Sequence, residues 1–232
     1  MSSRFPHEGR ADFGGIPLFA GLSETEVGAL LTRVRVRQFK AGEVIFHQDD
    51  PGDSLHVILD GLVKIYLPSG AGQEAVLIIL KPGEFFGELS LLDGAPRSAS
   101  AVTMEPTVTT TIDRANFHEF IREHPEAALT IFGVLASRLR RADGIIADAA
   151  FLDLPARVAK TLLDLAQRFG RPREDGIEIN IRLRQQDFAG MVSATRESVN
   201  RSLAALEEQG VIRIERQRIT VLRPEILERR IR

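Results

Sequence analysis

The feature of this sequence that most constrains its fold is a long helical stretch with a regular apolar stripe. Between Pro125 and Leu152 no further proline interrupts the chain. Apolar residues recur there in alternating steps of three and four, which is a heptad seam. The seam residues are Phe132, Leu135, Leu139, Ala142, Ile146 and Ala149. A helix of about 28 residues, at about 1.5 Å per residue, is about 42 Å long.

A helix of this length, apolar along one side, needs a surface to pack against. A second copy of the same helix supplies it most simply, in a parallel two-fold dimer. The alternative is that the helix packs along its whole length on the rest of its own chain. Because the stripe continues over three heptads, we predict that these residues form a homodimer interface.

The chain before this helix has a pattern typical of strands and turns instead of helix. Short runs of β-branched and apolar residues are separated by Gly, Pro and Asp turn signals, such as Asp50-Pro51-Gly52-Asp53. Such spacing predicts an antiparallel barrel or jelly roll. The predicted strands are Glu43–Phe46, Leu55–Leu59, Leu62–Leu67, Ala75–Leu80 and Val102–Ile112. Upstream, Ser23-Glu24-Thr25-Glu26 is a capping box that predicts a helix before the strands.

The chain after the long helix alternates again between helix and strand. Leu154-Pro155 ends the long helix and can begin the next. A loop over 171–176 and a strand over 177–181 follow. Two helices are predicted over 185–191 and 195–209, with Thr195 as N-cap and Gly210 after the C-terminus. Residues 211–214 and 219–222 predict a closing hairpin, so the segment has the elements of a winged helix-turn-helix.

Composition separates the two parts of the chain and excludes some chemistry. Residues 1–150 contain 14 Lys and Arg against 20 Asp and Glu, and residues 151–232 contain 16 against 12, so net charges of −6 and +4 sum to −2. A basic second part suggests nucleic acid as a partner, although drift in surface composition would look the same. With no cysteine, disulfides, thiolate catalysis and cysteine-ligated clusters are excluded. No apolar run approaches the roughly 20 residues of a membrane span, and no export signal is read, so a cytoplasmic protein is expected.

One segment of the strand-rich part has the chemistry of an anion site. Phe86-Gly87-Glu88-Leu89-Ser90 is followed by Pro96-Arg97-Ser98. A carboxylate suits a ribose hydroxyl because it only accepts hydrogen bonds, and an Arg beside a Ser suits a phosphodiester. The alternative is a barrel turn that contains a structural Glu–Arg pair.

The second candidate site is the helix over 195–209. Arg196, Glu197, Asn200 and Arg201 project from its first two turns, while Leu203, Ala204 and Leu206 are expected to pack. Arginine can pair with guanine O6 and N7, and glutamate can accept from cytosine N4. The alternative is an i,i+4 Glu–Arg pair on a solvated helix face.

These motifs together resemble the cyclic-AMP receptor protein branch of the CRP/FNR family of bacterial transcription regulators. The resemblance rests on Phe-Gly-Glu-Leu-Ser at 86–90, Pro-Arg-Ser at 96–98, Ala-Phe-Leu-Asp at 150–153 and Thr-Arg-Glu-Ser-Val at 195–199. It implies an α+β chain with a flexible N-terminus (1–14) and a jelly-roll-like antiparallel β-roll that binds a cyclic nucleotide (15–124). A dimerisation helix (125–152) and a DNA-binding winged helix-turn-helix (153–232) complete the implied organisation.

The resemblance also implies roles for individual residues. Gly87 and Glu88 match the ribose-binding pair, and Arg97 and Ser98 match the cyclic-phosphate ligands. The candidate nucleotide-binding set is Gly87, Glu88, Leu89, Arg97, Ser98, Ala142 and Asp143. The candidate DNA-binding set is Gln186, Thr195, Arg196, Glu197, Asn200 and Arg201. Arg196, Glu197 and Arg201 match the base-contacting residues, so the half-site should resemble TGTGA.

Two positions depart from the pattern. Where the cyclic-AMP branch usually has hydroxyl or amide residues facing the purine, this chain has Ala142 and Asp143. Ala142 cannot hydrogen-bond through its side chain, and Asp143 could accept from an adenine or a guanine amino group. The choice of purine therefore stays open, as does the possibility of an effector-independent regulator.

The resemblance implies cyclic AMP as an allosteric ligand and no covalent cofactor. Double-stranded DNA, RNA polymerase and a second copy of the chain are the implied partners. Two rival classes are considered. A haem sensor would need axial ligands, which the five histidines leave possible. A jelly-roll enzyme would need several inward His and carboxylate ligands, and no His-x-His pair occurs, so neither an enzyme nor a metal site is expected.

Overall fold

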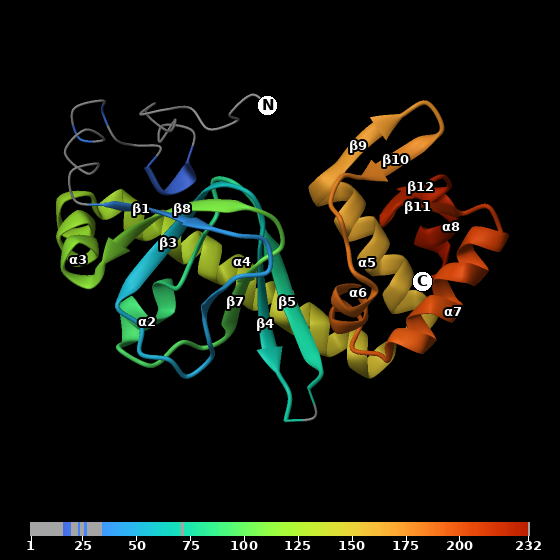
Figure 1. Cartoon of the computed structure of the whole chain (residues 1–232), viewed down its shortest axis with the longest axis horizontal. Helices are drawn as coiled ribbons and strands as arrows, with labels where there is room; N and C mark the ends of the chain where they lie inside the picture. The colour runs from blue at the N-terminus through green and yellow to red at the C-terminus, as the bar shows by residue number, and fades with distance from the viewer. Residues whose placement is uncertain (1–15, 20–22, 24–25, 27–33, 71, 232) are drawn as a thin grey trace. The chain divides into compact units, whose positions relative to one another are not determined.

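The computed structural model describes residues 16–19, 23, 26, 34–70 and 72–231 (Figure 1). The chain divides into two compact units. The first comprises Met1–Pro68 and Leu77–Arg138, and the second comprises Ser69–Val76 and Leu139–Arg232. The N-terminal segment predicted to be flexible (1–14) lies outside the described residues.

The first unit contains two four-stranded sheets whose strands pair antiparallel, as the strand spacing predicted. One sheet has the order β1-β8-β3-β6 and the other β2-β7-β4-β5. The strands of the first are β1 (Arg35–Phe39), β3 (Ser54–Asp60), β6 (Phe85–Phe86) and β8 (Thr107–Asp113). Those of the second are β2 (Val44–Phe46), β4 (Val63–Pro68), β5 (Glu74–Leu80) and β7 (Ser100–Thr103), and the first three residues of β5 are assigned to the second unit.

The prediction of one strand over 102–112 was wrong, because this segment contains two strands in different sheets. β7 pairs with β2 and β4, whereas β8 pairs with β1 and β3. Pro106 lies in the turn between them, where its missing N–H removes no ladder hydrogen bond. The Thr107 hydroxyl donates to the Glu105 carbonyl at 2.8 Å and closes that turn.

Apolar side chains from both sheets form the core. One cluster includes Leu55, Val57 and Ile112 together with the aromatic rings of Phe117 and Phe120. A second cluster, which joins the sheets, contains Ile58, Val63, Leu80, Phe86 and Ala101. Burial of these residues is the main driving force for closing the roll.

Three short helices in the described part of this unit were not predicted from the sequence. They are η2 (Pro17–Phe19), α2 (Glu88–Asp93) and α3 (Arg114–Glu123). The Asp113 carboxylate accepts from the Asn116 N–H and begins α3. The predicted capping box is confirmed where it is described, since the Ser23 N–H donates to Glu26 at 2.8 Å and the Glu26 N–H donates to the Ser23 hydroxyl at 3.3 Å. The rest of that predicted helix lies outside the described residues.

The long helix predicted over 125–152 is α4 (Pro125–Phe151). Near its start, Ala127 and Ile131 are buried in the core of the roll. The seam residues Phe132, Leu139 and Ile146 are 58%, 64% and 69% exposed within the single chain. The helix therefore packs on its own chain with one face and leaves most of the predicted seam exposed.

The second unit contains the predicted helix-turn-helix and hairpin. Its helices are α5 (Leu154–Phe169), α6 (Gln185–Met191), α7 (Arg196–Glu208) and α8 (Pro224–Arg229). Its single sheet has the order β11-β12-β10-β9. The strands are β9 (Gly170–Arg173), β10 (Gly176–Ile179), β11 (Ile212–Glu215) and β12 (Arg218–Val221).

Three details of this unit differ from the sequence predictions. Residues 170–173, mostly predicted as loop, form β9, because the turn before Gly176 folds this segment back against β10. Helix α8 was not predicted. Ala204 is exposed, and Val199 is buried with Leu203 and Leu206 instead. Across the described residues, no helix is both long enough and apolar enough to span a membrane.

Candidate functional site

The first candidate site begins at a sharp turn into α2. Gly87 is the N-cap and has a left-handed backbone (φ 82°). A Cβ at this position would lie 2.6 Å from Arg97 Nη1, so both conformation and space favour glycine. The turn brings Glu88, the first residue of α2, into the interior, where it is 1% exposed.

Arg97 crosses under this turn and is itself buried. Its Nη1 donates to the Gly87 carbonyl at 2.8 Å, and its Nη2 donates to the Ser54 hydroxyl at 3.3 Å. Its guanidinium lies 4.2 Å from the centre of the Phe46 ring. Burial lowers the pKa of Arg97 from its ordinary value, but arginine remains charged. A cation is thus held inside the roll beside the N-terminus of α2.

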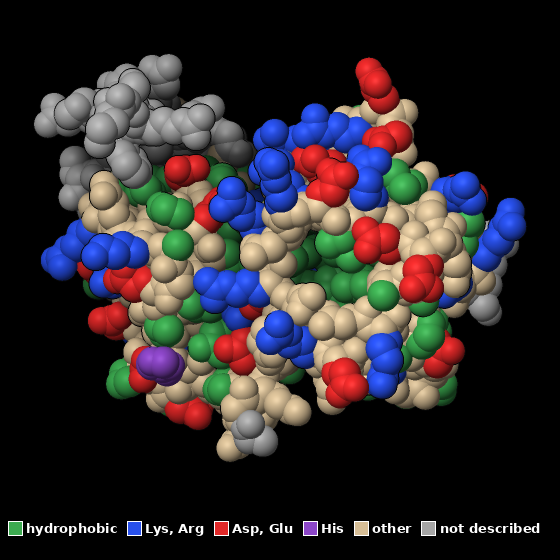
Figure 2. All heavy atoms as spheres, turned by 45° about the vertical axis from the view of Figure 1, so that its right-hand side comes forward, with side chains coloured by type: hydrophobic (Ala, Val, Ile, Leu, Met, Phe, Trp, Pro, Cys, Tyr) green, Lys and Arg blue, Asp and Glu red, His purple; other side chains and the backbone are tan. Residues whose placement is uncertain are grey.

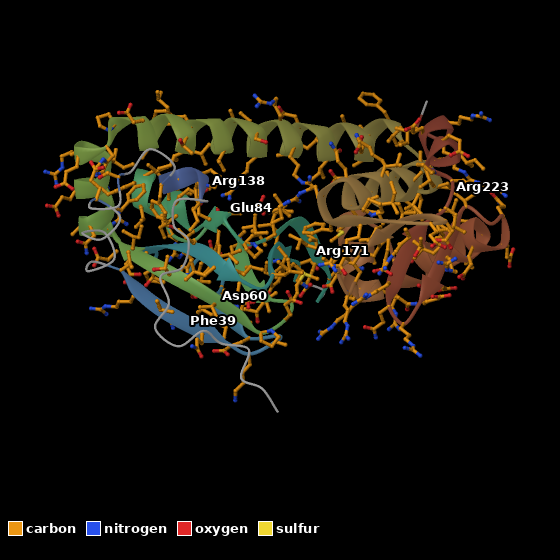
Figure 3. All side chains as sticks on the ribbon, turned by 90° about the horizontal axis from the view of Figure 1, so that it is seen from above. Phe39, Asp60, Glu84, Arg138, Arg171 and Arg223 are labelled. Carbon is orange, nitrogen blue, oxygen red and sulfur yellow. The ribbon has the colours of Figure 1, made fainter. Side chains whose placement is uncertain are left out.

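The partner of Glu88 is an arginine that the sequence analysis did not select. Arg138 on α4 donates from Nη1 to Glu88 Oε1 at 2.6 Å and also donates to the Phe85 carbonyl. Figure 3 shows the labelled Arg138 on the side of α4 that faces the roll. No direct Glu88–Arg97 contact is found among the described residues, although the charge of Glu88 raises the pKa of Arg97 against the larger effect of burial. The direct ionic partner of Glu88 is Arg138.

A signal for Arg138 was present in the sequence. It precedes Ala142 by four residues on the same helix, and residues four apart share a helix face. Only the fold shows that this face meets Glu88, which is 50 residues away in the chain.

Two buried polar atoms at this site have no hydrogen-bond partner among the described residues. They are Glu88 Oε2 and Arg97 Nε. An unpaired buried polar atom is costly and calls for an explanation, such as a ligand. A carboxylate oxygen could accept from a sugar hydroxyl, and a guanidinium N–H could donate to a phosphate. The donor and acceptor set therefore fits a ribose phosphate.

The other predicted nucleotide-binding residues are at the surface. Ser98 is exposed beside Arg97, and Leu89 is 38% exposed on α2. Ala142 and Asp143 are exposed on α4. The structure thus brings Gly87, Glu88 and Arg97 together, and it leaves the roles assigned to these four residues as predictions.

A third arginine, Arg114, binds backbone carbonyls of α2 and of the loop before β3. Arg114 donates to the carbonyls of Ser90 at 2.8 Å, Gly52 at 2.9 Å and Leu91 at 3.2 Å. A Cβ on Gly52 would lie 2.3 Å from the Ser90 Cβ, so glycine is required for this close approach. These contacts hold the short helix against the loop before β3.

His56 lies beside this site but inside the core. Its ring stacks on Phe86 with centroids 5.0 Å apart, and its Nδ1 lies 3.2 Å from the Thr109 hydroxyl. Burial, with a smaller contribution from Arg97, lowers the pKa of His56 to about 3. No group of three His, Asp or Glu side chains suited to a metal ion occurs in the described part of the chain.

The second candidate site is the pair α6 and α7. Thr195 caps α7, and its hydroxyl accepts from the Ser198 N–H at 3.2 Å, as predicted. Glu197 and Arg201 form the expected i,i+4 contact at 3.5 Å, and their side chains remain 83% and 72% exposed. An ion pair this exposed contributes little to stability, so both groups are available to a partner.

Arg196 and Asn200 share a neighbour on α6. Gln185 Oε1 accepts from Arg196 Nε at 3.0 Å and from Asn200 Nδ2 at 3.2 Å. Gln185 was not among the predicted site residues, which included the adjacent Gln186, exposed on the same helix. Periodicity alone could not show which glutamine faces α7.

The surface of this unit carries charges of both signs. Figure 2 shows Lys and Arg side chains interspersed with Asp and Glu. Part of this pattern is paired, since Arg173 contacts Glu178 at 3.0 Å and Arg218 contacts the same carboxylate at 3.2 Å. The turn between β11 and β12 presents Arg216 and Gln217, both with positive φ (48° and 66°). Helix α7 itself has two Arg against three Glu, so the net positive charge of this unit lies outside α7, in part on Arg216 of this exposed turn.

Comparison with known proteins finds one family for each of the two parts of the chain that contain a candidate site. A family described as the cyclic nucleotide-binding domain matches residues 36–124, and the Crp-like helix-turn-helix domain matches residues 156–230. A CRP-like cAMP-activated global transcriptional regulator of Mycobacterium tuberculosis is 38% identical over 93% of this chain and 96% of its own. The cyclic AMP receptor protein of Thermus thermophilus is 36% identical over 92% of this chain and 96% of its own.

The fold agrees with solved structures as well. The c-di-GMP responsive global regulator of Xanthomonas campestris has a TM-score of 0.76 at 22% identity, covering 86% of this chain and 99% of its own. Such a likeness shows the fold alone. The matching families and relatives are regulators of transcription, not enzymes. From its two domains and its relatives, the chain belongs to the CRP/FNR family of transcription regulators.

Proposed function

We propose that this chain is a homodimeric regulator whose sequence-specific DNA binding is controlled by cyclic AMP bound in the roll. The observation that carries the proposal is the buried pair of Glu88 and Arg97, with an unpaired acceptor at Glu88 Oε2 and an unpaired donor at Arg97 Nε. The partly exposed Arg138 contacts Glu88. Glu88 would accept from the ribose hydroxyl, and Arg97 with Ser98 would bind the cyclic phosphate. Two relatives named as cAMP-activated or cyclic AMP receptor proteins support this effector.

Arg138 provides a physical route from the ligand to the long helix. A ribose at Glu88 would share that carboxylate with Arg138, whose side chain belongs to α4. Ligand binding would therefore change the forces on α4 directly. Only residues 152 and 153 separate α4 from α5. Residues 151–155 would therefore act as a hinge through which a shift in α4 moves the helix-turn-helix.

The exposed seam supports the dimer. Phe132, Leu139 and Ile146 lie in heptad register, and each is more than half exposed. Two copies of α4 packed along this seam would bury these side chains, and a two-fold axis suits a palindromic site. The two copies of α7 would then enter successive major grooves about 34 Å apart, at TGTGA-like half-sites. Such a regulator would work in the cytoplasm, with RNA polymerase as a further partner.

A second candidate within the same family is a regulator that responds to another small molecule or to none. Ala142 and Asp143 favour this candidate, because neither offers the hydroxyl or amide usual at the purine-facing positions. Asp143 is exposed and could accept from either purine's amino group. Cyclic AMP and cyclic GMP are therefore the two nucleotides to compare.

Calorimetric titration with cyclic AMP and cyclic GMP tests the proposal. We expect cyclic AMP to bind the wild-type protein and to raise its affinity for a TGTGA palindrome. If only cyclic GMP binds, the effector is cyclic GMP instead of cyclic AMP, and the proposed binding site in the roll still stands. If neither nucleotide binds at millimolar concentration, the effector is wrong, and DNA binding can still be tested alone.

A further inference from the structure

The arrangement of α6 and α7 shows how one recognition side chain is held. Arg196 and Asn200 are four residues apart on α7 and therefore share a face. Gln185, the first residue of α6, reaches that face with a single oxygen that accepts from Arg196 Nε at 3.0 Å and from Asn200 Nδ2 at 3.2 Å. The three side chains form one hydrogen-bonded group across the two helices.

The atoms used in these contacts determine which atoms remain for DNA. Gln185 engages Arg196 through Nε, and neither terminal nitrogen of Arg196 has a hydrogen-bond partner among the described residues. The side chain is exposed. A bidentate contact to guanine O6 and N7 requires two parallel N–H groups of the guanidinium. The two terminal nitrogens of Arg196 are therefore left free for DNA, and the hydrogen bond from Nε to Gln185 fixes the direction in which they point.

Arg201 is held differently. Its Nη2 donates to the Ser198 hydroxyl at 3.2 Å, and its Nη1 lies 3.5 Å from Glu197. Its terminal nitrogens thus both have neighbours within α7, in weak, exposed contacts that DNA could replace. Of these two arginines, Arg196 is the one whose fork is presented free of protein contacts.

Asn200 is turned inward. It is half-buried, and its Oδ1 is shielded from solvent and has no partner among the described residues. A bidentate contact to adenine would need that oxygen at the surface. With its N–H on Gln185, Asn200 instead fixes the glutamine side chain that holds Arg196.

We propose that Gln185 is a positioning residue for DNA recognition, which together with Asn200 holds Arg196 by its Nε so that its terminal fork reads one guanine. This inference rests on the proposed DNA-reading function of α7. Holding a long side chain in advance lowers the conformational entropy lost on binding. The effect should therefore appear as preference at one base pair.

Binding selection on randomised duplexes, using the full-length protein with saturating cyclic AMP and without it, tests the proposal. Arg196→Ala first identifies the base pair that Arg196 reads. Gln185→Leu, which keeps the size but removes the acceptor, should reduce guanine preference at that base pair by about fivefold, the worth of a typical hydrogen bond. Asn200→Ala should relax the same base pair.

Gln185→Glu separates positioning from a merely structural role. It retains the accepting oxygen, so the guanine preference should stay within about twofold of wild type. Overall affinity should fall, because the added carboxylate repels phosphates. Gln209→Leu is the matched control: this exposed glutamine accepts from Arg230 at the far end of α7, and its removal should leave the selected sequences unchanged.

Four outcomes would overturn the inference. Unchanged preference for Gln185→Leu, when Arg196→Ala does shift it, shows that Gln185 does not position Arg196. Uniform weakening across all sequences would assign Gln185 to phosphate contact instead. Relaxation at a different base pair for Asn200→Ala would make Asn200 a base reader. If Arg196→Ala itself leaves the selected sequences unchanged, the proposed function of α7 fails together with the inference.

Discussion

Arg138 of α4 and Glu88 of α2 form an ion pair of 2.6 Å in which the carboxylate is 2% exposed and the guanidinium 26% exposed. The pair joins the long helix to the turn at Gly87, whose carbonyl accepts a hydrogen bond from the buried Arg97. A carboxylate this well buried depends on its partner, because an uncompensated buried charge is strongly destabilising. The candidate ligand site is thus linked to α4 by an interaction that a stability measurement can isolate.

Arg138→Ala should lower the free energy of unfolding of the roll by about 1–3 kcal/mol, since it leaves Glu88 buried without its cation and the guanidinium is only partly solvated. Urea unfolding of the full chain measures it. Arg141→Ala is the control, because its ion pair with Asp164 is about one-third exposed on both sides and should be worth about 1 kcal/mol or less. If both variants lower the free energy of unfolding equally, the burial of Glu88 does not make its ion pair stronger than an exposed one.

Arg97→Ala should weaken cyclic AMP binding at least about thirtyfold, because a charge-assisted contact to a buried phosphate is worth about 2–4 kcal/mol. Titration calorimetry measures the loss. Ser98→Ala, which removes an exposed hydroxyl beside the same site, should cost less. A variant that binds cyclic AMP as well as wild type does would remove Arg97 from the ligand site.

Acid should destabilise the roll through His56. Its folded pKa of about 3 lies below the unfolded value of about 6.5, so the unfolded chain binds the extra proton. Above about pH 6.5 the residue is neutral in both states and has no effect, and below it stability falls by up to about 1.4 kcal/mol per pH unit until the folded pKa is reached. His56→Phe keeps a ring against Phe86 and should unfold with a shallower pH dependence between pH 6.5 and 5. An unchanged slope in urea titrations would show that His56 is not the group responsible.

Leu139→Glu should convert the proposed dimer to a monomer or an aggregate, because two like charges would face each other across the two-fold axis. Light scattering at micromolar concentration measures it. Val36→Glu changes a similarly exposed residue on β1 (61% against 64%) and should leave the mass unchanged. A well-folded wild-type monomer would contradict the dimer and the palindromic site.

Glu197→Ala should relax preference at one base pair while non-specific binding holds or rises, because the change removes a carboxylate that would accept from cytosine and repel phosphates. Binding selection against wild type measures it. Arg196→Ala should instead lose about 1–3 kcal/mol of discrimination in each half-site. Unchanged selected sequences for Glu197→Ala would remove it from the base-reading set.

Local patterns predicted many elements correctly. The steps of three and four along 125–152 predicted α4, and the capping residue and apolar face of 195–209 predicted α7 to within one residue at each end. Such elements are encoded by neighbouring residues, whose spacing decides which side chains share a face. One prediction failed because a turn at Pro106 divides the segment 102–112, which is rich in Val and Thr, into β7 and β8. Another failed because residues 170–173 pair with β10 and so form a strand.

By itself, the sequence determined the longer helices and many of the strands, the family motifs and the candidates Glu88, Arg97 and Arg196, because these depend on residue type and short-range spacing. Only the tertiary structure decided which partners they have: Arg138 for Glu88, Ser54 and the Phe46 ring for Arg97, and Gln185 for Arg196. The physical reason is that hydrogen bonds and ion pairs require atoms within about 3–4 Å. Residues 11 to 51 positions apart in the chain come that close only after burial of the apolar core has brought their helices and strands together.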